Sequence, residues 1–291
     1  MASSLIARRN ARRKVGPERG APISWMGWSR IFLRLLCLAL SLLVCVPLHL
    51  AYRKIHYGSP FPRLFLLLAA RSVGARVRVH GVPLRRDVFY ISNHLGWVDI
   101  LALGGASGTA FVSAAEIGEA PIVGWLARMN RTVFITREDR MGVADQINRL
   151  REALADNWSI TVFPEGTCTD GQSLLPFKTP ILRVLEPPPP GVLVQPVVLD
   201  YGRVAEWIGW IGTESGMDNG KRVLARRGSF RLEVHFLEPF DPRDFLGRKA
   251  IAAEARSRIE PAIEAALGKP LRPFGHDAGS VRYVAKTADA A

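Results

Sequence analysis

From residue 76 onward, short apolar segments alternate with stretches of helical periodicity, and this alternation constrains the fold more than any other feature of the chain. Segments with the length and composition of buried β-strands occur at 76–80, 88–92, 110–114, 132–136, 159–163, 192–199 and 229–237. Apolar residues recur on one face of a helix predicted over 141–158, and a later helix is predicted over 244–267. Strands separated by helices predict an α/β fold, a mixed, partly parallel central sheet flanked by helices.

The basic residues of this chain are concentrated before the predicted sheet. Residues 1–86 hold 16 Lys or Arg and one acid, whereas the rest of the chain holds 23 basic and 25 acidic residues. Residues 1–30 are predicted to form a basic, disordered arm. A basic arm beside an apolar segment indicates an anionic membrane surface rather than nucleic acid. An arm that is only solvated and binds nothing is the alternative.

Two apolar runs follow the basic arm. Residues 31–51 would form a helix of roughly 31 Å, which is long enough to span a bilayer core. No clear cleavage site follows, so an uncleaved anchor is favoured over a signal peptide. The second run, 61–70, is too short to span and is bracketed by arginines. We therefore predict membrane-anchoring helices over 31–75, arranged as a hairpin in one leaflet.

The bounds of the main domain and of the C-terminal tail follow from where the predicted strands and helices begin and end. The 291 residues leave room for one large domain with appendages. We place that domain at 76–267, on the cytoplasmic side of the membrane, and a flexible tail at 268–291. The three cysteines show neither metal-ligand spacing nor a disulfide framework, which favours a reducing compartment.

One strand end carries a histidine and a carboxylate. The segment Asn-His-Leu-Gly-Trp-Val-Asp at 93–99 lies where the strand over 88–92 ends and a helix can begin. A histidine beside a carboxylate is the usual way to build an oriented general base. Residues five apart lie about 140° apart on an ideal helix, so His94 and Asp99 can meet only if His94 precedes the helix. A chance spacing in which Asp99 only caps the helix is the alternative.

Two further strand ends carry residues suited to a ligand. The strand over 159–163 runs into Pro-Glu-Gly-Thr, where Glu165 can accept hydrogen bonds from hydroxyl groups and Gly166 lets a ligand approach the backbone. The strand over 132–136 ends at Arg137, whose guanidinium suits phosphate. A charged turn and a surface arginine are the plainer interpretations of these two segments.

In order and spacing, these segments resemble the sequence blocks of the lysophospholipid and glycerophosphate acyltransferase family. The blocks are Asn-His with Asp five residues after the His, Phe-Ile-x-Arg, Phe-Pro-Glu-Gly-Thr and, at 196–198, Pro-Val-Val. The resemblance covers roughly 76–240, and the apolar N-terminus is similar to that of bacterial 1-acylglycerol-3-phosphate acyltransferases. It implies a glycerol-3-phosphate acyltransferase-like fold in an enzyme of the bacterial inner membrane. It also implies no cofactor, with acyl-ACP or acyl-CoA as the donor substrate.

The family resemblance gives the histidine and the carboxylate catalytic roles. His94 would take the proton from the acceptor hydroxyl, and Asp99 would orient it. The alkoxide would attack the acyl thioester, and backbone N–H groups near the loop are candidates for stabilising the oxyanion. No acyl-enzyme is required, so Cys168 is not expected to be a nucleophile. Metal-dependent hydrolysis by His94 and Asp99 lacks a third ligand.

The same resemblance assigns the substrate-binding residues. Glu165, Gly166 and Thr167 would hold the glycerol end of a lysolipid acceptor, and Arg137 would meet its phosphate. Asn93 is grouped with them because it precedes the histidine in the motif. The expected acceptor is 1-acylglycerol-3-phosphate, which would give phosphatidic acid in phospholipid biosynthesis. A lyso-ornithine lipid is the close alternative acceptor, and a non-catalytic protein that binds anionic lipid surfaces is the alternative of another class.

The chain also departs from the family pattern at several positions. Ala114 stands where many members have lysine, and Gly96 stands where many have serine. Arg131 and Thr132 replace a frequent glycine, and Pro180 replaces another. These changes leave the proposed catalytic pair in place, but they leave the identity of the acceptor open.

Overall fold

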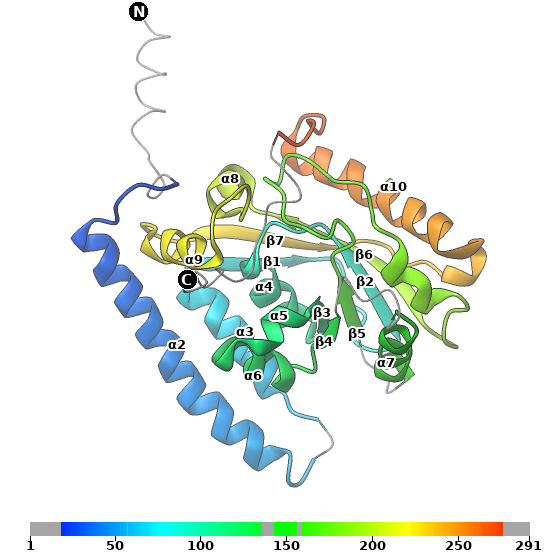
Figure 1. The fold of residues 1–291 in the computed structure, drawn as a ribbon, viewed down its shortest axis with the longest axis horizontal. Coiled ribbons are helices and arrows are strands. Elements are labelled where there is room, and N and C mark those ends of the chain that lie inside the picture. The colour runs from blue at the N-terminus through cyan, green and yellow to red at the C-terminus, as the bar shows by residue number, and fades with distance from the viewer. Residues whose placement is uncertain (1–18, 57, 136–142, 156–158, 276–291) are drawn as a thin grey trace, which may run out of the picture.

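The computed structural model describes residues 19–56, 58–135, 143–155 and 159–275, and one sheet lies at its centre (Figure 1). The strands are β1 Ala75–His80, β2 Val88–Ser92, β3 Ala110–Ala114, β4 Val133–Ile135, β5 Ser159–Val162, β6 Leu193–Asp200 and β7 Phe230–Phe236. They are ordered β1-β7-β6-β2-β5-β3-β4. Neighbouring strands are parallel except for β6 and β7, which are antiparallel. This arrangement confirms the predicted α/β fold with a mixed, mostly parallel sheet.

The α-helices frame this sheet and include both predicted ones. They are α2 Trp25–Tyr52, α3 Phe61–Ser72, α4 Trp97–Ser107, α5 Ala115–Glu119, α6 Pro121–Met129, α7 Val143–Ala155, α8 Ala205–Ile208, α9 Gly216–Ala225 and α10 Gly247–Leu267. The short 3₁₀ segments are η1 Pro180–Leu185, η2 Gly202–Val204 and η3 Pro242–Asp244. The predicted helix over 141–158 corresponds to α7, and the helix over 244–267 corresponds to α10.

The sheet separates two apolar cores because side chains alternate along each strand. Val88 and Tyr90 of β2 face a core that also contains residues of α3, α4 and α9. Phe89 and Ile91 face the opposite core, which contains residues of α7, α10 and the segment Pro180–Leu185. All four side chains are fully buried. The central strands are therefore covered on both faces, as expected for parallel strands.

Helix α2 begins at Trp25, ahead of the predicted apolar run over 31–51, and its first half is attached to α9. Arg30 donates to the carbonyl of Ala225, and Arg34 donates to the carbonyls of Val223 and Leu224. These carbonyls end α9, where the helix dipole favours a positive charge. The arginine that interrupts the apolar run is thus explained by this contact.

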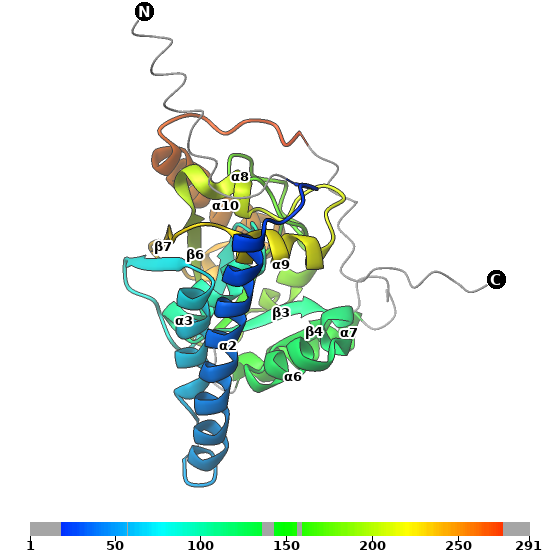
Figure 2. The same cartoon turned by 90° about the vertical axis from the view of Figure 1, so that its left-hand side faces the viewer.

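The rest of α2 presents apolar side chains to the outside. Among the described residues, α2 is the helix that is long and apolar enough to cross a membrane, and 11% of its most apolar window is buried. Figure 2 shows α2 and α3 side by side, with their connected ends reaching past the body of the protein. After Arg34, the large exposed apolar residues of α2 include Leu35, Leu36, Leu40, Leu43, Val44, Leu48 and Leu50.

The first residues after α10 make ordered contacts, although the predicted flexible tail starts at 268. The N–H of Arg272 donates to the carbonyl of Gln172, and its guanidinium pairs with Asp170 at 2.8 Å and with Glu206 at 2.6 Å. Leu271 packs against the core under α10. The remainder of the predicted tail, from 276, and most of the predicted basic arm, 1–18, lie outside the described residues.

Candidate active site

The sequence motifs meet at the carboxyl ends of three neighbouring parallel strands. Strand β2 lies between β6 and β5, and the loop after each strand carries site residues. His94 follows β2, Glu165 follows β5, and Tyr201 follows β6. Open α/β sheets place ligand sites at such strand ends, because the loops there converge. The topology thus brings together residues that are far apart in the sequence.

His94 and Asp99 form a direct hydrogen-bonded pair. His94 Nδ1 lies 2.7 Å from Asp99 Oδ2, and the Asp99 side chain is fully buried. His94 precedes α4, which begins at Trp97, so the pair meets in the way that the spacing requires. A carboxylate on Nδ1 leaves Nε2 as the nitrogen that can accept a proton from a substrate.

The Asp99 carboxylate is held by three further donors. Oδ2 accepts the N–H groups of Leu95 at 2.6 Å and Gly96 at 2.9 Å, and Oδ1 accepts a short hydrogen bond from the Tyr201 hydroxyl. Asp99 therefore caps α4 and orients His94 at once. The two amides were candidates for stabilising an oxyanion, but they serve the carboxylate instead. Tyr201 was missed from the sequence, although it is the first residue after a strand that leads into the site.

The imidazole of His94 has two other neighbours. Its ring stacks on Phe163 with the centroids 4.1 Å apart and the planes at 16°. Cys168, in the loop that carries Glu165, is the second neighbour that acts on the ring. Burial opposes charging of the imidazole, but the contacts with Cys168 and Asp99 outweigh it and raise the pKa of His94 well above its usual value. The site therefore favours the imidazolium that forms when His94 takes a proton.

Glu165 bridges the histidine loop and the segment that follows β5. Its Oε1 accepts the N–H of His94 at 2.9 Å, and its Oε2 accepts the N–H of Leu175 at 2.9 Å. The side chain is buried, and burial raises the pKa of Glu165 to about 8, although the two N–H groups and the charge of His94 oppose this shift. Glu165 therefore holds the backbone on which His94 sits.

The two residues after Glu165 differ in their surroundings. Gly166 has a φ of +72°, and a Cβ there would lie 2.8 Å from the ammonium of Lys178, so this position requires glycine. The Lys178 side chain thus lies over the turn. The Thr167 hydroxyl is buried and finds no hydrogen-bond partner among the described residues. A buried unpaired hydroxyl is costly unless a ligand satisfies it.

Asn93, which is expected to contact the substrate, uses both ends of its side-chain amide within the protein. Its amide oxygen accepts the N–H of Leu199 at 2.8 Å, and its amide nitrogen donates to the Leu199 carbonyl at 3.0 Å. Both ends of the buried amide are used to fix the β2 loop to the end of β6. Asn93 therefore positions His94. The expected phosphate ligand Arg137 lies outside the described residues.

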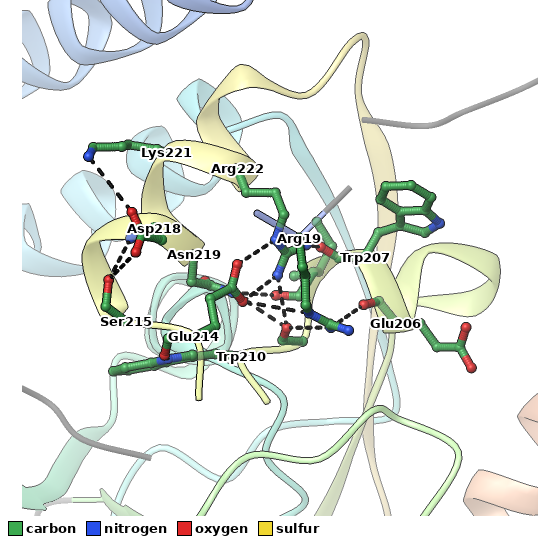
Figure 3. Close-up of polar contacts among 12 residues, drawn as sticks. Arg19, Glu206, Trp207, Trp210, Glu214, Ser215, Asp218, Asn219, Lys221 and Arg222 are labelled. Atoms are coloured by element: carbon green, nitrogen blue, oxygen red, sulfur yellow. Dashed lines mark hydrogen bonds and ion pairs between the residues drawn. The ribbon is translucent and has the colours of Figure 1, made fainter. Parts of the chain in front are cut away.

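Polar contacts from the segment that contains α8 and α9 support the histidine loop. The Trp97 indole donates to Asn219 at 2.9 Å, and the N–H of Trp210 donates to the Leu95 carbonyl at 2.8 Å. In the network of Figure 3, Arg222 pairs with Glu214 at 2.6 Å. These contacts fix the loop from a segment that is distant in sequence.

The N-terminal segment joins the same network. Arg19 donates to the carbonyls of Glu206 at 2.7 Å and Gly209 at 3.2 Å, and lies 3.7 Å from the Glu214 carboxylate (Figure 3). The residues ahead of α2 are therefore tied to the loop that contacts the site.

Comparisons with known proteins agree with this geometry. Residues 76–200 match the family model described as Acyltransferase. The chain is 33% identical to a lyso-ornithine lipid O-acyltransferase of Rhodobacter capsulatus, over 88% of this chain and 96% of the relative. It is 30% identical to another from Brucella abortus, over 83% and 97%.

A solved structure shows the same fold. The 1-acyl-sn-glycerophosphate acyltransferase PlsC of Thermotoga maritima superposes with a TM-score of 0.62 at 21% identity, over 82% of this chain and 95% of that protein. Together with the near full-length relatives, this shows that the chain is an acyltransferase and belongs to the PlsC-like lysophospholipid acyltransferase family.

Proposed function

We propose that the protein is a lyso-ornithine lipid O-acyltransferase. The observation that carries this acceptor is the match to lyso-ornithine lipid O-acyltransferases over nearly their whole length. We rank this acceptor ahead of 1-acylglycerol-3-phosphate, which the motifs alone favoured. The change from the frequent lysine to Ala114 supports the ranking, because an acceptor without phosphate needs fewer cations at the site.

The geometry supports a direct transfer in which His94 is the general base. Nε2 of His94 takes the proton of the acceptor hydroxyl, and the oxygen attacks the carbonyl carbon of the acyl thioester. The resulting tetrahedral intermediate collapses to the ester as the C–S bond breaks, and the proton on His94 passes to the leaving thiolate. Asp99 holds the required tautomer and stabilises the imidazolium during this cycle.

The loop after β5 is the proposed binding site for the polar end of the acceptor. Thr167 supplies a buried hydroxyl with no partner among the described residues, and Lys178 supplies a positive charge above Gly166. An ornithine headgroup carries a carboxylate, which suits the Lys178 ammonium. Glu165 fixes the loop between these groups and His94, and Arg137 is proposed to border the headgroup. Family members use acyl thioester donors without cofactors, and we propose acyl carrier protein or coenzyme A as the carrier.

The site is proposed to work at the cytoplasmic face of the bacterial inner membrane. The exposed apolar surface of α2 and the lipid-modifying relatives indicate that the protein associates with membrane. We propose that residues 31–75 anchor the domain over 76–267 in one leaflet, and that the basic cluster at 8–14 of the predicted arm binds anionic headgroups. A lysolipid in that leaflet then reaches His94 without leaving the membrane.

An assay of the purified full chain tests the acceptor. Lyso-ornithine lipid and 1-acylglycerol-3-phosphate are each offered with a long-chain acyl carrier protein thioester and, separately, a coenzyme A thioester, with His94→Ala as the inactive control. We expect rapid ester formation on lyso-ornithine lipid, at least about tenfold faster than on the phosphate acceptor, and no product with the control.

The outcomes separate the acceptor from the chemistry. Faster transfer to 1-acylglycerol-3-phosphate would reject the proposed acceptor but keep the acyl transfer mechanism. Full activity of His94→Ala would reject the mechanism. A wild-type protein that turns over neither acceptor but binds anionic vesicles would support the non-catalytic alternative.

A further inference from the structure

A second group of histidines lies at the far end of the sheet from the β3–β4 edge. His80 ends the edge strand β1, and its partner in the parallel register of β7 is His235. Glu233 is two residues before His235 and therefore points to the same face of β7. The side chains of His80, Glu233 and His235 are 48%, 20% and 29% exposed, so the group is open to solvent on one side.

The distances within this group match those of metal ligands. Both His80 Nε2 and His235 Nε2 lie 3.6 Å from Glu233 Oε2, and all three candidate ligand atoms lie within 4.8 Å of one another. Ligands about 2.1 Å from a tetrahedral zinc ion are about 3.4 Å apart. The two 3.6 Å separations from Glu233 are close to that value, but they are too long for hydrogen bonds.

One of these ligand atoms is buried without a partner. His235 Nε2 has no solvent contact and no hydrogen bond among the described residues. A buried polar atom without a partner is one that a bound ion can satisfy. The other oxygen of Glu233 is 3.3 Å from Arg231, which leaves Oε2 directed to the histidines.

The backbone beneath the group is rigid. Gly81 follows His80 with a φ of +76°, and a Cβ there would lie 2.1 Å from the Phe236 carbonyl oxygen. The Gln195 amide nitrogen donates to the carbonyls of Val82 and Leu237, which follow β1 and β7. The two strands that carry the histidines are therefore locked together where the ligands leave the backbone. Such support is what a metal site requires.

We propose that His80, Glu233 and His235 bind one divalent transition-metal ion, with zinc the best fit. Two imidazole nitrogens and one carboxylate oxygen suit zinc, and a water molecule would complete the tetrahedron. The two rings are stacked with centroids 4.5 Å apart and planes at 12°, so the exposed His80 ring must tilt toward the ion. The ion would tie β1 to β7 without contacting the His94–Asp99 pair, so the proposal does not depend on the proposed function.

Metal binding to the detergent-solubilised full chain tests this site. The chain is treated with a chelator and titrated with Zn²⁺ by calorimetry, and with Co²⁺ followed by visible absorption, because tetrahedral Co²⁺ gives strong bands. We expect one ion per chain and a melting temperature that rises with Zn²⁺ but not with Mg²⁺. His235→Gln and His80→Gln should each weaken Zn²⁺ binding by roughly 100-fold, since each removes one of three ligands.

Matched variants exclude adventitious binding. His56→Gln removes an exposed imidazole elsewhere, and Glu238→Gln removes an exposed carboxylate just after β7, and both should bind zinc like the wild type. Circular dichroism of the metal-free His80→Gln variant shows whether it is folded. Because the His80 side chain is half exposed, we expect its replacement to leave the fold intact, so that weaker zinc binding reports the loss of a ligand. The proposal is overturned if the wild type binds no stoichiometric ion, or if folded His80→Gln and His235→Gln bind zinc as tightly as the wild type.

Discussion

Two regions of this protein place histidine beside a carboxylate, and their hydrogen bonding differs. In the proposed catalytic region, His94 and Asp99 are 2.7 Å apart, and the buried carboxylate accepts further bonds from Leu95, Gly96 and Tyr201. At the β1–β7 edge, His80 and His235 each lie 3.6 Å from Glu233, and Nε2 of His235 has no hydrogen-bond partner in the described part of the chain. Among the described residues, the histidine–carboxylate pair has its hydrogen bonds filled in the first region, whereas the histidines and the carboxylate of the second region do not bond to one another.

The difference teaches how the surroundings select the chemistry of a histidine. A buried carboxylate whose oxygens are held by several donors fixes one tautomer of its histidine, which suits a residue that must take and release a proton. Imidazoles that face a carboxylate at tetrahedral spacing keep their lone pairs free, which suits a metal ion. The two regions differ in how completely their side chains are hydrogen-bonded, rather than in the kinds of residue they contain.

Replacement of Asp99 by Asn should have the largest effect, because Asp99 is the carboxylate on which the hydrogen bonds of the first region converge. The amide keeps the size of the side chain but offers Nδ1 a donor, which favours the wrong tautomer of His94. We expect kcat to fall by roughly 10³–10⁴-fold. Steady-state acyl transfer measures the loss, and Glu238→Gln, an exposed acid outside both regions, should keep full activity. Retention of more than a tenth of the activity by Asp99→Asn would contradict the role of the pair.

The pH dependence of stability sharpens the comparison through Glu165, a buried carboxylate with only two hydrogen-bond donors. Its pKa is raised from 4.5 to about 8 in the folded protein, so the folded state binds the proton more tightly. This contribution to stability is complete below pH 4.5 and is lost as pH rises toward 8. Across that window the wild type should lose on the order of 5 kcal/mol relative to Glu165→Gln. Urea unfolding of both proteins at several pH values measures the difference, and parallel curves would show that Glu165 is ionised throughout.

Removal of the Tyr201 hydroxyl tests whether its hydrogen bond to Asp99 affects the pKa of His94. Without this donor, more of the Asp99 charge acts on the imidazole, so Tyr201→Phe should raise the pKa of His94 further. The free base would then be scarcer at neutral pH, and we expect kcat/KM at pH 7 to fall by roughly tenfold. The pH profile is the decisive measurement, because its rising limb should move to higher pH. A uniform loss at every pH would indicate a purely structural role.

These effects also show what the sequence could predict. The strand segments could be placed because buried parallel strands read as short apolar runs, and β2 and β3 occupy the predicted ranges 88–92 and 110–114. The pairing of His94 with Asp99 followed from helix geometry, because five residues of separation demand that His94 precede the helix. Both predictions rest on patterns within a short stretch of sequence.

Features that depend on contacts between distant segments could not be predicted in this way. Tyr201 reaches Asp99 because β6 lies beside β2, and His80 meets His235 because β1 lies beside β7. Neither adjacency leaves a spacing signal in one sequence. Asn93 was expected at the substrate for the same reason, since only the fold shows that Leu199 occupies both ends of its amide.

Replacement of Cys168 by Ala should have the smallest effect, although Cys168 is a neighbour that acts on the His94 imidazole. Cys168, His94 and Asp99 together resemble a nucleophilic triad, which would acylate the thiol before transfer. In direct transfer the acceptor oxygen takes the place beside His94, so the thiol contact is dispensable and activity should change by less than about threefold. Quenched reactions of the wild type with the acyl donor alone, followed by mass spectrometry of the intact chain, should show no added acyl group. An acyl-enzyme on Cys168, together with an inactive Cys168→Ala variant, would move the nucleophile from the lipid to the protein and leave His94 and Asp99 to activate a thiol.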